Sequence, residues 1–139
     1  GLSDRLSMSY IKSTSFDRYK FASISAKSTD DAQTRKTAEM FTDLLWSDPI
    51  TSKSGGSLNG CHPNNHRGAG YLFGANISEQ FCKKYGFNLV IRSHEVRQEG
   101  ITQDHPHCVT VFSSSLYCGG SNKAAVVVID PNQSGITVD

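Results

Sequence analysis

Several features that would define a specialised class of protein are lacking in this 139-residue sequence. No apolar run approaches the roughly 20 residues that a membrane-spanning helix needs, and no signal peptide is visible. There is little net charge, because 14 basic and 13 acidic side chains leave only +1. This balance gives no reason to expect nucleic acid or an anionic membrane as a partner. With 37% hydrophobic residues and a mean hydropathy of −0.39, the sequence is typical of one soluble globular domain or part of one.

A C-x-x-C pair is also lacking, which argues against a zinc-ribbon site. The four cysteines are Cys61, Cys82, Cys108 and Cys118. We expect all four to be thiols in a reducing compartment, which predicts an intracellular protein of the cytoplasm or nucleus. Because Gly1 is not an initiator methionine, we also expect that upstream residues have been removed or that the sequence begins inside a longer polypeptide.

The first third of the sequence is polar and shows no sustained period. Residues 23–36 are therefore predicted to be a mobile loop or insertion. From Thr37 onward, apolar residues recur at helical spacing, which predicts a helix that ends near Pro49. Residues 52–65, rich in Ser, Gly, Asn and Pro, are predicted to be a second loop.

A second helix is indicated by the segment NISEQFCKKYG. Asn76 is the expected N-cap, with Glu79 completing a capping box. Lys83 and Lys84 suit the C-terminal end, and Gly86 suits the left-handed residue that follows it.

Short strands complete the predicted α/β architecture. Residues 71–73 are a short apolar stretch closed by Gly74, and strands are expected at residues 87–92, 108–112 and 124–129. The last two do not alternate in polarity, so we expect both of their faces to be covered.

Four polar positions could carry chemistry, and each also has an ordinary structural explanation. His94 follows a predicted strand, where it could be a ligand or only a satisfied polar residue. Arg67 precedes Gly-Ala-Gly and could bind phosphate, although Arg-Gly is also common in solvated turns. Asp48 precedes a proline, where a turn is the default interpretation, and Tyr117 lies in a small-residue loop that could be an exposed turn.

The order of the surrounding motifs is more specific than any one residue. GLSD opens the sequence, and LLWSDP, RGAGYLFG, a helix, LVIRSHEV, VTVFS with YCG, and NKAAVVV follow between Leu44 and about Ile129. This order resembles the C-terminal half of the metal-dependent serine/threonine phosphoprotein phosphatases, the calcineurin-like family. Within that family, GLSD, the polar insertion, the Gly-Cys pair and GSNKAA look closest to the EF-hand-containing, retinal-degeneration-C type branch.

The resemblance implies a fold and an activity. Residues 1–139 would be the C-terminal part of a single catalytic domain, a β-sandwich with flanking helices. The family hydrolyses phosphoserine and phosphothreonine with two divalent ions, for which Mn, Fe or Zn are suited. The implied partners are phosphoprotein substrates, a regulatory subunit and the N-terminal half of the domain.

The resemblance also assigns individual residues. His94 matches a metal ligand, and Arg67 matches the arginine that binds the substrate phosphate. Asp48 matches an acidic residue at the rim of the site. Tyr117 matches an aromatic residue of the active-site groove, and Cys118 matches a cysteine of the same groove.

Departures from the family pattern limit these assignments. The sequence SSSLY stands where Ser-Ala-Pro-Asn-Tyr is usual, and Ala124 replaces a usual glycine. The motifs Gly-Asp-x-His-Gly, Gly-Asp-x-Val-Asp-Arg-Gly and Gly-Asn-His-Glu, which carry the other ligands, do not occur. Because one imidazole cannot retain a divalent ion, the chain alone is expected to be inactive. The alternative is a phosphatase-like module without catalysis that serves a binding or structural role in a larger assembly.

Two other kinds of site are weaker matches. His107-Cys108 begins a cysteine-phosphatase signature, but Ser114 stands where an arginine is needed. The segment DPNQSGITVD, residues 130–139, matches the start of an EF-hand loop. It follows a Val-rich strand rather than a helix, so a hairpin turn is the preferred interpretation.

Overall fold

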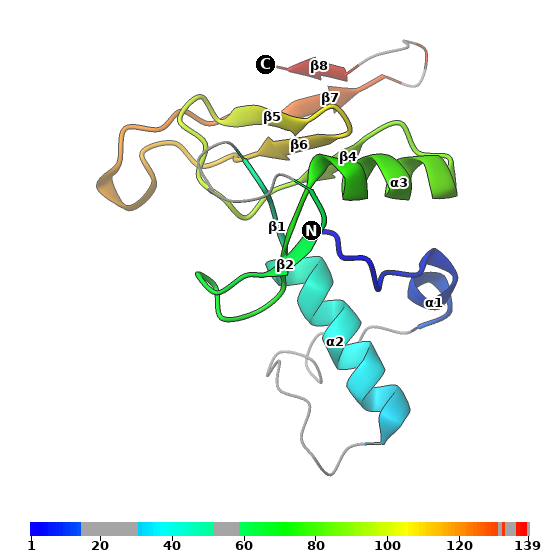
Figure 1. The fold of residues 1–139 in the computed structure, drawn as a ribbon. Coiled ribbons are helices and arrows are strands. Elements are labelled where there is room, and N and C mark those ends of the chain that lie inside the picture. The colour runs from blue at the N-terminus through cyan, green and yellow to red at the C-terminus, as the bar shows by residue number, and fades with distance from the viewer. Residues whose placement is uncertain (15–30, 52–58, 131, 133–135, 139) are drawn as a thin grey trace.

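The computed structural model describes residues 1–14, 31–51, 59–130, 132 and 136–138. Figure 1 shows one group of strands at one end of the molecule, further strands near its middle, and a long helix projecting away at the other end. The helices are α1 (Met8–Ser13), α2 (Ala32–Trp46) and α3 (Ala75–Tyr85), with a short 3₁₀ turn at Tyr117–Gly119. The strands are β1 (Asp48–Pro49), β2 (Cys61–Pro63), β3 (Tyr71–Phe73), β4 (Val90–Arg92), β5 (Ile101–His105), β6 (Cys108–Val111), β7 (Val127–Ile129) and β8 (Ile136–Val138).

Helix α2 begins earlier than the sequence pattern predicted. The Asp31 side chain accepts a hydrogen bond from the Thr34 backbone N–H at 2.8 Å and so caps the helix. The prediction of a loop over residues 23–36 is therefore wrong for residues 32–36, whereas residues 23–30 lie outside the described part of the chain. The prediction failed because residues 32–36 are mostly polar, and a polar first turn still forms a helix when its N-terminal end is capped.

Helix α3 is confirmed, but its N-terminal cap is not the predicted one. Gly74 occupies the N-cap position, and the Asn76 side chain instead accepts a hydrogen bond from the Gly60 backbone N–H at 2.8 Å. The C-terminal prediction is confirmed, because Gly86 has φ 71° and the last turn carries Lys83 and Lys84. Asn76 thus joins the helix to the start of β2 rather than closing its own first turn.

The sheets are small and mixed. In the first, β1 pairs with β3 in parallel and β2 pairs with β3 antiparallel, in the order β1-β3-β2. In the second, β4 pairs with β6 in parallel and β5 pairs with β6 antiparallel, in the order β4-β6-β5. The first sheet corrects the prediction of a loop over residues 52–65, because Cys61–Pro63 is a strand and residues 52–58 lie outside the described part.

Strands β7 and β8 form an antiparallel hairpin, with Ile129 opposite Ile136. This pairing confirms the hairpin interpretation over an EF-hand loop. The prediction that both faces of this segment are covered is wrong, because Val128 is 47% and Ile129 67% exposed. By contrast, alternate residues of β6 are buried, and Cys108 and Thr110 are inaccessible.

A small hydrophobic core joins segments that are distant in sequence. Leu2 and Leu6 pack with Met40 of α2, Phe73 of β3 and Cys108 of β6. Burial of the Phe73 ring stabilises the folded state by about 2–3 kcal/mol. The core therefore fixes the N-terminal segment, α2 and the two sheets relative to one another. None of the helices in the described residues is long and apolar enough to cross a membrane.

Candidate functional site

Asp48 lies where the end of α2 meets the first sheet. Helix α2 ends at Trp46, and the next residues enter β1, where Asp48 lies opposite Leu72 of β3. The Asp48 side chain is only 8% exposed. Its oxygen Oδ2 accepts hydrogen bonds from Arg67 Nε and Asn64 Nδ2, each at 2.9 Å, and Oδ1 pairs with Arg92 Nη2 at 2.7 Å. Burial raises the pKa of Asp48, but the Arg67 hydrogen bond and the Arg92 charge outweigh it and hold this pKa below its ordinary value.

Arg67 is presented by a tight turn between β2 and β3. The Asn64 carbonyl accepts the backbone N–H groups of Arg67 and Gly68, at 3.1 and 2.9 Å. Gly68 has φ 67° and Gly70 has φ 68°, a backbone conformation that glycine adopts without steric cost. The Arg67 side chain leaves this turn, binds Asp48 through Nε, and donates from Nη2 to the His94 carbonyl oxygen at 3.2 Å.

His94 lies just beyond the end of β4. Its φ is 82°, which is uncommon for a residue with a Cβ and typical of functional positions. The exposed imidazole lies edge-on to the Trp46 ring, with ring centroids 5.1 Å apart. Partial desolvation, followed by the positive charge of Arg67, lowers the pKa of His94 below its ordinary value. The imidazole is therefore neutral near pH 7, which is the form that binds metal ions.

The structure thus brings together Asp48, Arg67 and His94, three of the four predicted site residues. Tyr117 packs edge-on against Phe112, with ring centroids 5.2 Å apart, and is 49% exposed. Among the described residues, no hydrogen bond, ion pair or ring contact joins it to the other three. Left-handed residues lie on both sides of Tyr117, because Leu116 before it has φ 51° and Cys118 after it has φ 50°.

Sequence reasoning missed two polar residues that hold this site together, Asn64 and Arg92. Both are buried, with 3% and 8% exposure. Arg92 pairs with Asp48 on one side and with Glu95 on the other, and Arg97 continues the series from Glu95 to the inaccessible carboxylate of Asp104. The acidic neighbour on each side offsets the cost of burying the Arg92 charge, although the Nε atom of Arg92 has no hydrogen-bond partner among the described residues. Only the position of Arg92 at the end of an apolar run hinted at this role.

The four cysteines are free thiols, as predicted. Cys108, the weak candidate for a cysteine-phosphatase nucleophile, is inaccessible. Burial, and then the negative charge of Asp104, raise the pKa of its thiol to about 12. Because the thiolate is the nucleophile, Cys108 is chemically inert at neutral pH, which together with the missing arginine excludes a cysteine-phosphatase mechanism at this residue.

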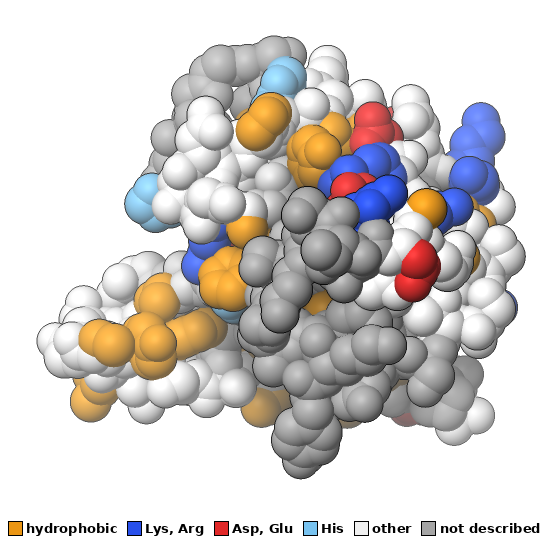
Figure 2. All heavy atoms as spheres, turned by 90° about the horizontal axis from the view of Figure 1, so that it is seen from below, with side chains coloured by type: hydrophobic (Ala, Val, Ile, Leu, Met, Phe, Trp, Pro, Cys, Tyr) orange, Lys and Arg blue, Asp and Glu red, His pale blue; other side chains and the backbone are white. Residues whose placement is uncertain are grey.

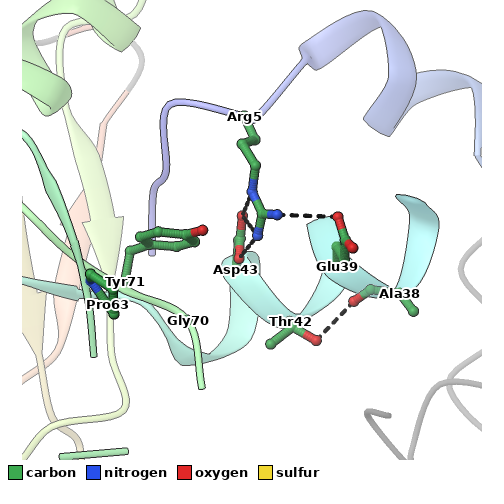
Figure 3. A pocket seen from close by; sticks show the side chains of 8 residues that line it. All are labelled: Arg5, Ala38, Glu39, Thr42, Asp43, Pro63, Gly70 and Tyr71. Atoms are coloured by element: carbon green, nitrogen blue, oxygen red, sulfur yellow. Dashed lines mark hydrogen bonds and ion pairs between the residues drawn. The ribbon is translucent and has the colours of Figure 1, made fainter. Parts of the chain in front are cut away.

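Charged side chains also gather elsewhere on the surface (Figure 2). Figure 2 shows basic and acidic side chains next to one another on one part of the face seen from below. A hollow of about 290 Å³ is lined by Arg5, Ala38, Glu39, Thr42, Asp43, Pro63, Gly70 and Tyr71 (Figure 3). Arg5 contacts the buried Asp43 at 2.9 Å, extends to Glu39, and lies over the Tyr71 ring (Figure 3). These contacts attach the N-terminal segment to α2. The hollow therefore has a structural role, and Asp48, Arg67 and His94 are not among the residues that line it.

His94 is the candidate metal ligand of this site. In the part of the chain that the structure describes, no group of three or more His, Cys, Asp or Glu side chains could hold a metal ion. The donor chemistry of His94 nevertheless fits a metal, because its exposed ring is neutral and its carbonyl is fixed by Arg67. The described residues therefore fit a single ligand of a metal centre rather than a complete one.

Comparison with known proteins identifies the class to which this fold and site belong. The model of the calcineurin-like phosphoesterase family matches residues 5–98. The chain therefore belongs to the calcineurin-like phosphoesterase family, as its motifs predicted, and members of this family use divalent metals.

The relatives give a more particular likeness. The chain is 37% identical over 131 residues to serine/threonine-protein phosphatase rdgC of Drosophila melanogaster, covering 91% of the chain and 19% of that protein. It is 40% identical over 91 residues to serine/threonine-protein phosphatase T of Aspergillus oryzae, covering 64% of the chain and 18% of that protein. It is 41% identical over 91 residues to human serine/threonine-protein phosphatase with EF-hands 2, covering 64% of the chain and 11% of that protein. The chain thus spans less than a fifth of the length of these curated relatives.

A solved structure supports the fold. A serine/threonine phosphatase from Saccharomyces cerevisiae, described as similar to human phosphatase PP5, superposes with a TM-score of 0.58 at 25% identity. The match covers 72% of this chain and 33% of that one. The predicted α/β class and calcineurin-like fold are therefore confirmed.

Proposed function

We propose that this chain supplies the phosphate-binding arginine and one metal ligand of a serine/threonine phosphoprotein phosphatase. The observation that carries the proposal is the contact between Arg67 and His94, 27 residues apart in sequence and joined by a 3.2 Å hydrogen bond. This contact supports the proposal because the guanidinium bonds to the backbone of the same residue whose imidazole would bind a metal. The names of the relatives, serine/threonine-protein phosphatases, support the substrate class.

Arg67 is prepared for phosphate by the way it is anchored. Its Nε and Nη2 atoms are bound to Asp48 and to the His94 carbonyl, and among the described residues no protein group bonds Nη1. The outer edge of the guanidinium, Nη1 with the second Nη2 hydrogen, can bind two phosphate oxygens together. In this role Arg67 orients the phosphoryl group and stabilises the charge that develops on it.

His94 would be one ligand of a pair of divalent ions, for which Mn, Fe or Zn are suited. When bound, such ions supply Lewis-acid polarisation of the phosphoryl group and a nucleophilic water. The remaining ligands would come from outside this sequence, in the N-terminal half of the same catalytic domain. A chain with His94 alone would not retain the ions, so the segment of residues 1–139 by itself would be inactive.

The other assignments form part of the same proposal. Asp48 acts as the anchor of Arg67 at the rim of the site, and Tyr117, with Cys118, borders the groove that receives the protein substrate. Phosphoproteins would be the substrates, with a regulatory subunit as a further partner. The four free thiols support a location in the cytoplasm or nucleus.

A phosphatase assay on a phosphorylated peptide, with Mn, tests the proposal in the intact protein. We expect His94→Ala and Arg67→Ala each to lower kcat/KM at least about 100-fold, because each removes a group that acts on the phosphoryl transition state. His62→Ala is the matched control, since His62 is an exposed histidine of β2 whose ring bonds to the Asn59 carbonyl and, among the described residues, to no group of the Asp48 site.

The outcomes separate the two functions that the sequence allowed. An intact protein without turnover would favour the non-catalytic module, which the altered SSSLY loop motivates. Strong turnover by the isolated chain of residues 1–139, lost in its His94→Ala variant, would instead contradict the inactivity proposed for this segment.

A further inference from the structure

Asp48 is held from two sides by two different arginines. Arg67 Nε binds its Oδ2 atom at 2.9 Å, and Arg92 Nη2 binds its Oδ1 atom at 2.7 Å. Because each arginine uses a separate oxygen, the plane of the carboxylate that Arg67 meets is set by Arg92. Asn64 adds a third bond to Oδ2, also at 2.9 Å.

Arg92 is itself fixed and does not reach the surface. Its side chain is 6% exposed and leaves the last residue of β4, which lies opposite Thr110 of β6. Its Nη1 atom donates to Glu95 and, at 3.3 Å, to the inaccessible Thr110 hydroxyl, while Nη2 also approaches the Ser47 carbonyl at 3.4 Å. The planar Arg92 guanidinium thus connects Thr110 of the second sheet to the Asp48 carboxylate of the first sheet.

We propose that Arg92 is a positioning residue for phosphate binding, acting through Asp48 on Arg67. The inference rests on the proposed function, because it specifies how the phosphate-binding arginine of that site is held. The connection runs from β4 through Arg92 to Asp48 and from there to Arg67. Arg92 contributes no contact to the phosphate, since its side chain is enclosed.

The physical basis is the geometric demand of two-point binding. A guanidinium binds two phosphate oxygens well only when its plane is fixed. Without Arg92, one oxygen of Asp48 would lose its charged partner, and the carboxylate could turn toward water and release Arg67. A lysine at position 92 would keep the charge but could not join Asp48, Glu95 and Thr110 through a rigid fork.

Inhibition by inorganic phosphate measures this effect directly. In the intact, metal-loaded protein, we expect Arg92→Lys to raise the inhibition constant of phosphate and the KM of a phosphopeptide about tenfold, the equivalent of one charged hydrogen bond. Arg92→Met should raise both further. Arg5→Lys is the matched control, because Arg5 pairs with the buried Asp43 outside the Asp48 connection, and its phosphate inhibition constant should stay within about twofold of wild type.

A double-mutant cycle separates positioning from general loss of structure. In an Arg67→Lys background, Arg92→Lys should have little further effect on phosphate inhibition, because the group that it positions is already gone. An equal effect in both backgrounds, or an unchanged inhibition constant in a folded Arg92→Lys protein, would overturn the inference. Wild-type protein without turnover or phosphate inhibition would overturn the proposed function first and this inference with it.

Discussion

At the scale of single residues, the site depends on how closely the Arg67 turn approaches the end of α2. A Cβ atom at Gly70 would lie 2.6 Å from the Trp46 carbonyl carbon and 2.8 Å from the Ser47 nitrogen. The Gly70 carbonyl also accepts the Asn64 backbone N–H at 3.1 Å, which closes the turn. The absence of a side chain at position 70 therefore allows the turn to lie directly on the backbone that leads into Asp48.

Replacing Gly70 tests this close approach. We expect Gly70→Ala to lower the free energy of unfolding by about 3 kcal/mol, because a backbone clash is added to a left-handed conformation. Gly68→Ala is the control, since φ there is also positive but nothing lies within 4 Å of the added atom, and it should cost only about 1 kcal/mol. Chemical denaturation measures both. Equal losses would show that the contact with Trp46 is unimportant.

Cysteine reactivity gives a second test at this scale. With its pKa raised to about 12, the enclosed Cys108 thiol would be ionised to only about one part in ten thousand at pH 8. We expect iodoacetamide to label exposed Cys118 first and to reach Cys108 and buried Cys82 only in denaturant. Mass spectrometry of peptides after timed labelling would measure the order. Labelling of native Cys108 as fast as Cys118 would contradict the burial described here.

The residues that could be predicted from the sequence are those marked by local motifs. Arg67 precedes glycines and His94 ends an apolar run, so the motif order identified both. Arg92 could not be assigned, because its partner Asp48 lies 44 positions away and only the folded chain brings them together. The role of Asn64 was hidden for the same reason, although Asn in a turn is an ordinary signal.

At the scale of elements, helix α2 leads into Asp48 at its C-terminal end and is capped by Asp31 at its N-terminal end. Asp31 accepts hydrogen bonds from both the backbone N–H and the hydroxyl of Thr34, each at 2.8 Å. These bonds lower the pKa of Asp31 below its ordinary value of 3.8. Since the folded pKa is the lower one, the stabilisation is present above pH 3.8 and is lost as the pH falls through the folded value.

The cap therefore predicts an acid-dependent effect on thermal stability. We expect Asp31→Ala to lower Tm by a few degrees at pH 7, with a smaller difference from wild type below about pH 3. Asp31→Asn should keep most of the capping, because an amide oxygen accepts the same hydrogen bond without titrating. Calorimetry over a pH series would measure this. A difference that persists unchanged in acid would refute the role of the carboxylate.

Element ends were the least predictable part of the fold. The left-handed Gly86 was found because glycine after a basic last turn has a direct physical meaning. The prediction that Asn76 caps α3 was wrong, because the Asn76 side chain accepts a hydrogen bond from the backbone N–H of Gly60, a residue distant in sequence. Strand β5 was missed because ITQDH has little apolar character, and only pairing with β6 makes it a strand.

At the scale of the whole molecule, one series of charges joins the two larger sheets. It runs from Arg67 through Asp48, Arg92, Glu95 and Arg97 to Asp104, and each neighbouring pair lies within 3.1 Å. Arg67 is thereby connected to β4 and β5 rather than to its own turn alone. The family could be recognised from motif order, but this connection appears only in three dimensions.

The central claim is that Arg67 and His94 converge on one phosphate-sized site beside a metal centre. A crystal structure of the intact protein with Mn and tungstate, an analogue of phosphate, tests it most directly through anomalous scattering. We predict an Mn ion about 2 Å from a His94 ring nitrogen and tungstate oxygens within hydrogen-bonding distance of the Arg67 guanidinium. Mn bound elsewhere with His94 free, or tungstate held away from Arg67, would contradict the account.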